Sequence, residues 1–263
     1  MRSLNIASTG MLAQQLNVEV ISNNIANMNT TGFKRQRAEF QDLIYQNIER
    51  MGSTSSASGT LVPTGIQVGS GVKTGAVYRL MSQGNMNLTE SRYDLAIEGK
   101  GFFRIRKPDG ETGYTRAGSF ALSATGQIVT NDGYPVEPGI TVPQDATDVT
   151  INSQGQVSIK LAGQTAETVV GQLELAIFPN EAGLESLGDN LFRETASSGA
   201  AQVGTPGGTG YGTILQGFLE TSNVNAVSEI TSLITAQRAY DMNSKVITAS
   251  DEMLQTTSRL ARG

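Results

Sequence analysis

The sequence predicts an α+β protein in which helices at the N- and C-terminal ends form a coiled-coil-like α domain, with a β-rich central domain inserted between them. Three observations support this fold class. Apolar residues recur at helical spacing near both ends of the chain. Between about residues 51 and 215, short alternating stretches are separated by turns that contain Gly. The 263 residues are enough for one large domain or two modest ones.

The N-terminal helix is predicted from a stripe of positions three or four residues apart, of which all but one are apolar. Residues 30–32 should end it, because Gly32 can adopt the left-handed conformation that often follows a helix C-terminus. Residues 1–32 are therefore the first part of the α domain. The stripe consists of Leu4, Ala7, Met11, Gln14, Val18, Ile21, Ile25 and Met28.

Residues 33–75 are expected to contain a second helix followed by an extension rich in Ser and Gly. The helix is predicted from about residue 34 to residue 50, with Phe33, Phe40, Ile44 and Ile48 on one side. Residues 53–59 form the densest part of the Ser/Gly-rich extension.

The β-rich domain is predicted over residues 76–215. Strands are expected at residues 101–106, 119–122, 157–161 and 169–178, several of which alternate apolar and polar residues. Two similar segments, residues 122–128 and 151–157, each predict a hairpin that turns at its Gly, Gly126 or Gly155.

Residues 216–263 are assigned to a C-terminal helix, which Asn225 can cap and whose first turn contains Glu229. Two apolar stripes run along this helix. A two-stranded coiled coil needs only one stripe, so two stripes indicate neighbours on more than one side. The first stripe contains Ala226, Ile230, Leu233, Tyr240, Ile247 and Leu254, interrupted by Gln237, Ser244 and Asp251; the second contains Ala239, Met242, Val246, Ala249, Met253 and Leu260.

The composition excludes several kinds of chemistry. The chain has no Cys, no His and no Trp, so thiol nucleophiles, His-based triads and Cys or His metal sites are impossible. We expect no cofactor and no metal site. A net charge of −5 argues against nucleic-acid binding. No apolar run is long enough for a cleavable signal peptide or a transmembrane helix, so neither is expected.

Three motifs resemble functional sites but fail as predictors. Residues 69–75 lack the spacing of a phosphate-binding loop, because Val72 separates the Gly from Lys73. Residues 34–37 form a dense basic cluster, for which a solvated or subunit-bridging patch is favoured over nucleic-acid binding. Asp94 and Glu98 could form a glycosidase carboxylate pair, but any chain with 24 acidic residues offers such pairs.

The terminal helices are expected to need helical partners. They are long and carry few ion pairs four residues apart, so an isolated helix gains little stability from its own sequence. We expect them to order against helices of other molecules. The alternative is that the two ends pair with each other within one molecule.

Residues 22–34 carry the most specific motif. Asn23, Asn24 and Asn27 place amides beside the apolar positions Ile25 and Met28, and buried amides must be paired, so they fix register. The segment resembles the N-terminal motif of the bacterial flagellar rod and hook family. The resemblance continues, in family order, at residues 99–103, 114–120, 126–134, 220–225 and 237–245, and therefore spans the whole chain.

The resemblance implies a structural subunit rather than an enzyme. The terminal helices would pack with those of neighbouring copies into an inner tube around an export channel, and the β-rich domain would form the outer layer. The chain length and the Ser/Thr/Gly-rich residues 46–71 favour a place in the distal rod, which passes torque from motor to hook. A proximal rod subunit is the nearest alternative, and a β-rich adhesin is a more distant one.

The implied partners are further copies of the chain, proximal rod subunits, hook subunits, the surrounding basal-body rings and the flagellar export apparatus. The implied location is the basal body, across the periplasm to the level of the outer membrane. The residues expected to mediate assembly fall in the two terminal segments. They are Met11, Val18, Ile21, Asn23, Asn24, Ile25, Ala26, Asn27, Met28, Gly32 and Phe33 in the first, and Asn223, Asn225, Ile230, Leu233, Gln237, Tyr240, Val246, Ile247 and Leu254 in the second.

Overall fold

The computed structural model describes residues 2–49, 64–163 and 166–260. The chain divides into two compact units, each assembled from separate segments. The helical unit contains Met1–Ile25, Gln36–Tyr78 and Ala226–Gly263, and the β unit contains Ala26–Arg35 and Arg79–Asn225. Helices at both ends and a strand-rich middle make this an α+β protein, as predicted.

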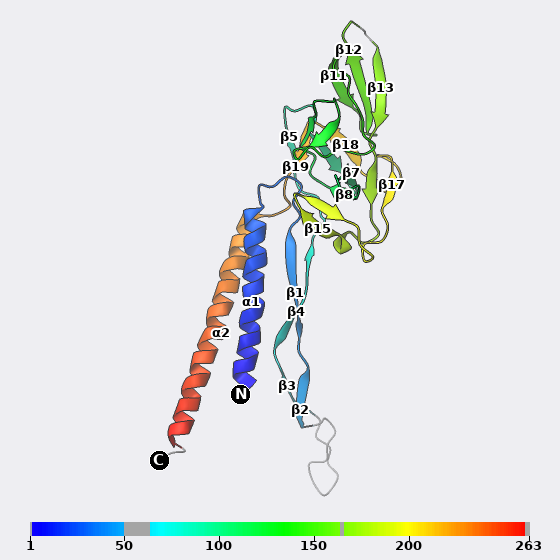
Figure 1. Cartoon of the computed structure of the whole chain (residues 1–263). Helices are drawn as coiled ribbons and strands as arrows, with labels where there is room; N and C mark the ends of the chain where they lie inside the picture. The colour runs from blue at the N-terminus through cyan, green and yellow to red at the C-terminus, as the bar shows by residue number, and fades with distance from the viewer. Residues whose placement is uncertain (1, 50–63, 164–165, 261–263) are drawn as a thin grey trace. The chain divides into compact units, whose positions relative to one another are not determined.

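The helical unit contains two long helices, α1 (Arg2–Ala26) and α2 (Ala226–Leu260). They lie side by side and run in opposite directions (Figure 1). Two contacts fix this pairing. Asn24 near the end of α1 donates a hydrogen bond to Glu229 at the start of α2, and Gly10 of α1 lies against Asn243 of α2. The two ends of the chain therefore do pair within one molecule.

The N-terminal helix ends about one turn earlier than the sequence indicates. Ala26 is its last residue, and a turn over the next six residues includes a hydrogen bond from Thr30 N to Asn27 O of 3.2 Å. Met28 therefore lies beyond the helix and is 39% exposed. Gly32 does adopt a left-handed conformation, with φ of 69°.

The predicted helix over residues 34–50 is wrong. The chain instead forms β1 (Gln36–Asp42), which pairs with β4 (Val72–Arg79), and β2 (Tyr45–Glu49), which pairs with β3 (Ile66–Gly69). Arg37, Glu39 and Gln41 alternate with Ala38 and Phe40, and this two-residue period specifies a strand. Spacing of the apolar residues alone suggested a helix. Part of the Ser/Gly-rich extension, including all of residues 53–59, lies outside the described residues.

The β unit is built on a six-stranded antiparallel sheet in the order β15-β16-β8-β7-β14-β17. A three-stranded sheet, β11-β12-β13, and three strand pairs, β5 with β19, β6 with β18 and β9 with β10, complete it. The short helix η1 spans Glu181–Gly183. The strand bounds are β5 Met86–Leu88, β6 Leu95–Glu98, β7 Phe102–Arg106, β8 Thr112–Thr115, β9 Phe120–Leu122, β10 Ile128–Thr130, β11 Ala146–Ile151, β12 Gln156–Leu161, β13 Glu167–Gln172, β14 Leu175–Ile177, β15 Glu185–Gly188, β16 Leu191–Arg193, β17 Gln202–Gly204, β18 Thr213–Gln216 and β19 Phe218–Glu220.

The strand predictions hold with one correction. Both hairpins are present, and their glycines have positive φ, 82° at Gly126 and 78° at Gly155. Residues 169–178 do not form one strand, because the chain leaves the three-stranded sheet after β13 and enters the six-stranded sheet at β14. Between them, Leu173 N donates a hydrogen bond to Gly155 O at 2.7 Å.

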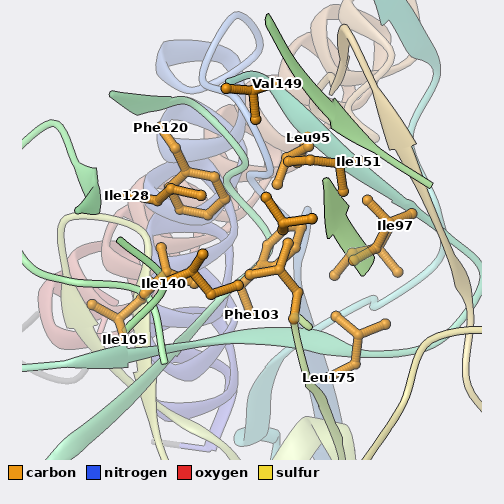
Figure 2. Packing of buried hydrophobic residues seen from close by; sticks show 14 of the residues in the cluster. Leu95, Ile97, Phe103, Ile105, Phe120, Ile128, Ile140, Val149, Ile151 and Leu175 are labelled. Carbon is orange, nitrogen blue, oxygen red and sulfur yellow. The ribbon is translucent and has the colours of Figure 1, made fainter. Parts of the chain in front are cut away.

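Two apolar cores occupy the two faces of β7. Successive side chains of a strand point to opposite faces, so Phe102 and Phe103 belong to different cores. Figure 2 shows Phe103 among aliphatic side chains of β6, β10, β11 and β14. Phe102 packs edge to face against Phe178 and Phe192, at ring-centroid distances of 5.8 and 5.9 Å. The β unit thus encloses most of its own large apolar side chains.

Within the described residues, neither helix contains a stretch apolar and long enough to cross a membrane.

Candidate assembly site

The face of α2 that packs on α1 follows neither of the two apolar stripes. It is a third stripe with residues seven apart: Glu229, Ala236, Asn243 and Ser250. Glu229, Ala236 and Ser250 are buried, and Asn243 lies against Gly10 of α1. A Cβ atom at Gly10 would come within 2.8 Å of Asn243 Nδ2, so a larger residue at this position would displace the Asn243 side chain.

Several large apolar side chains of α2 consequently stay exposed, although Leu233, Ile247 and Leu254 of the first stripe are half-buried. In the first stripe, Ile230 is 48% and Tyr240 42% exposed. In the second, Met253 is 63% and Leu260 80% exposed. The exposed apolar residues of the second stripe, together with Ile230 and Tyr240 of the first, mark a surface suited to contact with other proteins. The stripe of Glu229, Ala236, Asn243 and Ser250 lies between the two apolar stripes, so the exposed residues of both can contact other molecules.

Asn24 joins three elements of the helical unit. Its Nδ2 donates to Gln36 O at 2.8 Å and to Glu229 Oε2 at 3.1 Å, and its Oδ1 accepts from Gln36 N at 2.8 Å. Asn24 is 1% exposed. A buried amide with three hydrogen bonds fixes the register of α1, β1 and α2 relative to one another.

The structure places the remaining predicted assembly residues at different depths. In the first segment, Ile21 and Gly32 are buried, Met11, Val18, Ile25, Asn27 and Phe33 are half-buried, and Asn23, Ala26 and Met28 are exposed. In the second, Asn223, Leu233, Ile247 and Leu254 are half-buried, and Asn225, Ile230, Gln237, Tyr240 and Val246 are exposed.

A buried charge cluster lies in the β unit, where three parts of the chain meet. Glu220 accepts a hydrogen bond from Lys34 Nζ at 2.6 Å and one from Arg116 Nε at 3.0 Å. It also accepts from Gly84 N at 2.9 Å. The side chains of Lys34, Arg116 and Glu220 are only 1%, 5% and 0% exposed. The charges therefore hold together segments that are far apart in the sequence.

The charges of this cluster set its pKa values. Burial raises the pKa of Glu220, but the charges of Arg116 and Lys34 outweigh burial and leave the pKa below its usual value. Burial lowers the pKa of Lys34, and the charge of Arg116 adds to this. A solvated or subunit-bridging patch is thus wrong for Lys34, which lies inside the β unit.

A second polar connection lies beside this cluster. Asn223 Oδ1 accepts from Arg35 N at 2.7 Å, while its Nδ2 donates to Leu80 O at 2.8 Å and to Ser82 O at 3.0 Å. Gly32 N donates to Glu220 O at 2.8 Å. The motifs around residues 32–35 and 220–223 are therefore hydrogen-bonded to each other within the β unit.

Lys34, Arg116 and Glu220 were not among the predicted site residues, although each lies in one of the motifs. The available indication was the placement of single charged residues inside motifs that are otherwise apolar or uncharged. Pairing across 186 residues of sequence has no periodic pattern, so sequence reasoning could not connect them.

Asp94, one of the two carboxylates considered for a glycosidase pair, is hydrogen-bonded within the β unit. Asp94 accepts a hydrogen bond from Thr89 Oγ1 at 2.8 Å and sits at an isolated bridge with Ser119. Among the described residues, no three Asp or Glu side chains are grouped so that they could hold a metal ion.

Three segments match known families. Residues 4–34 match the flagella basal body rod protein family, residues 96–159 the flagellar hook protein FlgE/F/G D1 domain, and residues 215–260 the flagellar basal body rod FlgEFG protein C-terminal family.

Full-length relatives are also similar. The flagellar basal-body rod protein FlgG of Caulobacter vibrioides is 65% identical over 99% of both chains. The proteins of the same name from Agrobacterium fabrum and from Buchnera aphidicola subsp. Schizaphis graminum are 54% and 50% identical, over 98% of this chain and 99% of theirs.

Terminal helices around a strand-rich middle, together with these matches, define a structural subunit of the flagellar rod and hook class and not an enzyme. Within that class, the chain belongs to the family of flagellar basal-body rod proteins. The adhesin alternative finds no support among these relatives.

Proposed function

We propose that this protein self-assembles into the tubular distal rod of the flagellar basal body. In this proposal α1 and α2 of neighbouring copies pack side by side, in a coiled-coil-like manner, as an inner tube around an export channel. The β unit forms the outer layer, and the rod transmits torque from the motor to the hook. The name that the relatives share, basal-body rod protein, supports the basal body as its location.

The exposed apolar residues on the two stripes of α2 carry this proposal. Within one molecule α2 uses its small and polar stripe, so Ile230, Tyr240, Val246 and Met253 remain 42–63% exposed. Removing such side chains from water is favourable, by about 25 cal/mol for each Å² of apolar surface. Two stripes on either side of the α1 contact suit a helix that has neighbours in a tube on both sides.

Further partners follow from a place in the distal rod. Proximal rod subunits would adjoin one end, hook subunits the other, and the basal-body rings would surround the outer layer. Delivery would use the flagellar export apparatus without a cleavable signal peptide, and the rod would cross the periplasm to the outer membrane. The assembly residues predicted from the sequence belong to this proposal.

The test is polymerisation of the purified chain at high concentration, followed by electron microscopy. We expect straight tubes from the unmodified protein and none from Ile230→Asp or Met253→Asp, because each puts a charge into an apolar contact. Thr256→Asp is the matched control, since it adds the same charge on the side of α2 that carries Arg238, Lys245 and Glu252.

Both Ile230 and Met253 are exposed, so the variants should keep the circular dichroism spectrum and melting temperature of the soluble protein. Normal tubes from both stripe variants would contradict the proposal. Loss of tubes from Thr256→Asp alone would contradict it too, because assembly would then depend on the charged side of α2.

A further inference from the structure

A cavity of about 250 Å³ in the β unit opens beside the buried charge cluster. Its wall includes Lys34, Lys100, Arg116 and Glu181, with Phe102 as an apolar surface and Gln83 at the side. Lys100 is exposed, whereas Lys34 and Arg116 are buried. The wall thus carries three cationic groups and one carboxylate.

The buried part of this wall is short of negative charge. Lys34 and Arg116 share a single carboxylate, that of Glu220, which does not itself line the cavity. Two buried cations with one buried anion leave a net positive charge away from water, which is unfavourable unless another anion approaches. Glu181 supplies part of that compensation, since its charge acts on Lys34 in the opposite direction to that of Arg116.

Both cations keep hydrogen-bond donors that the described residues do not use. Lys34 Nζ donates to Ser82 O at 2.9 Å and to Glu220 Oε1 at 2.6 Å, and its third proton has no acceptor among those residues. Arg116 donates through Nε to Glu220 and through Nη1 to Gly99 O at 2.9 Å and Gly101 O at 2.7 Å.

Arg116 Nη2, in turn, has no acceptor within the described part of the chain. Its side chain is 5% exposed, so little of the guanidinium reaches bulk solvent. An ionised donor in such a place forms its strongest hydrogen bonds with a carboxylate, which can accept from two N–H groups at once. The wall therefore lacks an acceptor of this kind.

We propose that this cavity binds a carboxylate group. One carboxylate oxygen accepts from Arg116 and the other from Lys34, while Lys100 closes the entrance with a third positive charge. Phe102 contacts the carbon atoms behind the carboxylate. The volume fits the end of an acidic side chain or a small dicarboxylate. This carboxylate can come from either of two sources: a free dicarboxylate ion, or an Asp or Glu side chain of another molecule.

Binding is tested on the soluble full-length chain with succinate as the probe, at constant ionic strength maintained with chloride. Calorimetry and NMR shifts of the Gly99 and Gly101 amides should show saturable binding. Lys100→Gln should weaken it by about tenfold, because the third positive charge no longer attracts the carboxylate. Glu181→Gln should tighten it, because the repelling carboxylate is gone. Lys100 is exposed, so its variant should fold normally.

Lys160→Gln is the matched control, since it removes an exposed Lys of β12 that does not line the cavity. It should bind succinate as the unmodified protein does. Absence of saturable binding to the unmodified protein, or equal affinity in the Lys100 and Lys160 variants, would overturn the proposal.

A polymerisation assay distinguishes the two sources. If an acidic side chain of a neighbouring copy occupies the cavity, succinate should slow tube formation at constant ionic strength, and Lys100→Gln should slow it without succinate. If a free ion is the ligand, succinate should bind and leave the assembly rate unchanged. Succinate binding is measured on the soluble chain, so failure of the unmodified protein to form tubes contradicts only the proposed function.

Discussion

The helical unit and the β unit bury different kinds of side chain. In the β unit most of the large apolar residues lie inside, with Phe102 and Phe103 2% and 0% exposed. In α2 the buried stripe is small or polar, and Met253 and Leu260 are 63% and 80% exposed. The β unit therefore contains the apolar contacts that stabilise it, whereas much of the apolar surface of the helical unit is left for other molecules.

Substitution at the buried charge cluster should have the largest effect on the β unit. Glu220→Gln leaves Lys34 and Arg116 without their carboxylate, and loss of one partner in a buried ion pair costs about 3–5 kcal/mol. We expect hydrogen exchange to become faster throughout the β unit by a corresponding factor.

Glu185→Gln is the matched control for this substitution. It removes a carboxylate that pairs with Arg193 at 2.7 Å but is 50% exposed, and exposed pairs contribute about 0–1 kcal/mol. Similar effects from the two variants would show that burial does not distinguish these ion pairs.

A smaller effect is expected at Asn24 in the helical unit. Asn24→Ala leaves Gln36 N and O without their side-chain partners, at a cost of about 1–3 kcal/mol in the free energy of unfolding. Hydrogen exchange should become faster in α1 and β1 and stay unchanged in the six-stranded sheet. Ser22→Ala, an exposed change on the same helix, should stay within about 0.5 kcal/mol. Faster exchange in both units would mean that they do not unfold separately.

The smallest effect is the pH dependence of the β unit. The pKa of Glu220 lies below its ordinary value of 4.5 in the folded state, so the unfolded chain binds more protons on the acid side. This contribution to stability is fully present above about pH 4.5 and is lost as the pH falls through the lowered pKa. Each unit of pKa difference corresponds to about 1.4 kcal/mol.

Melting temperatures of the β unit measured from pH 6 to pH 3 should therefore fall less steeply in Glu220→Gln than in the unmodified protein. The chain has no His, so no side chain has an unperturbed pKa between 5 and 8, and stability should vary little across that range. If the melting temperature fell equally steeply with pH in the two proteins, carboxyl groups other than Glu220 would be responsible for the pH dependence of stability.

Periodic patterns led to correct predictions where a single period dominated. The 3.6-residue period at both ends predicted α1 and α2, and Asn225 marked the residue before α2 begins. Gly126 and Gly155 marked two hairpins because their turns require a positive φ. Over residues 36–42 two periods competed, and the polar alternation of Arg37, Glu39 and Gln41 specified the strand.

The sequence by itself therefore determined the two terminal helices, the two hairpins and the family of this protein, because these depend on local spacing and on motifs. The tertiary structure decided which face of α2 is used inside the molecule. The apolar pattern predicted contacts through the large residues of α2. Two helices that approach closely need small residues at the contact, here Gly10 and Ala236. It also decided the pairing of Lys34 and Arg116 with Glu220, because charges far apart in sequence meet only when the chain folds.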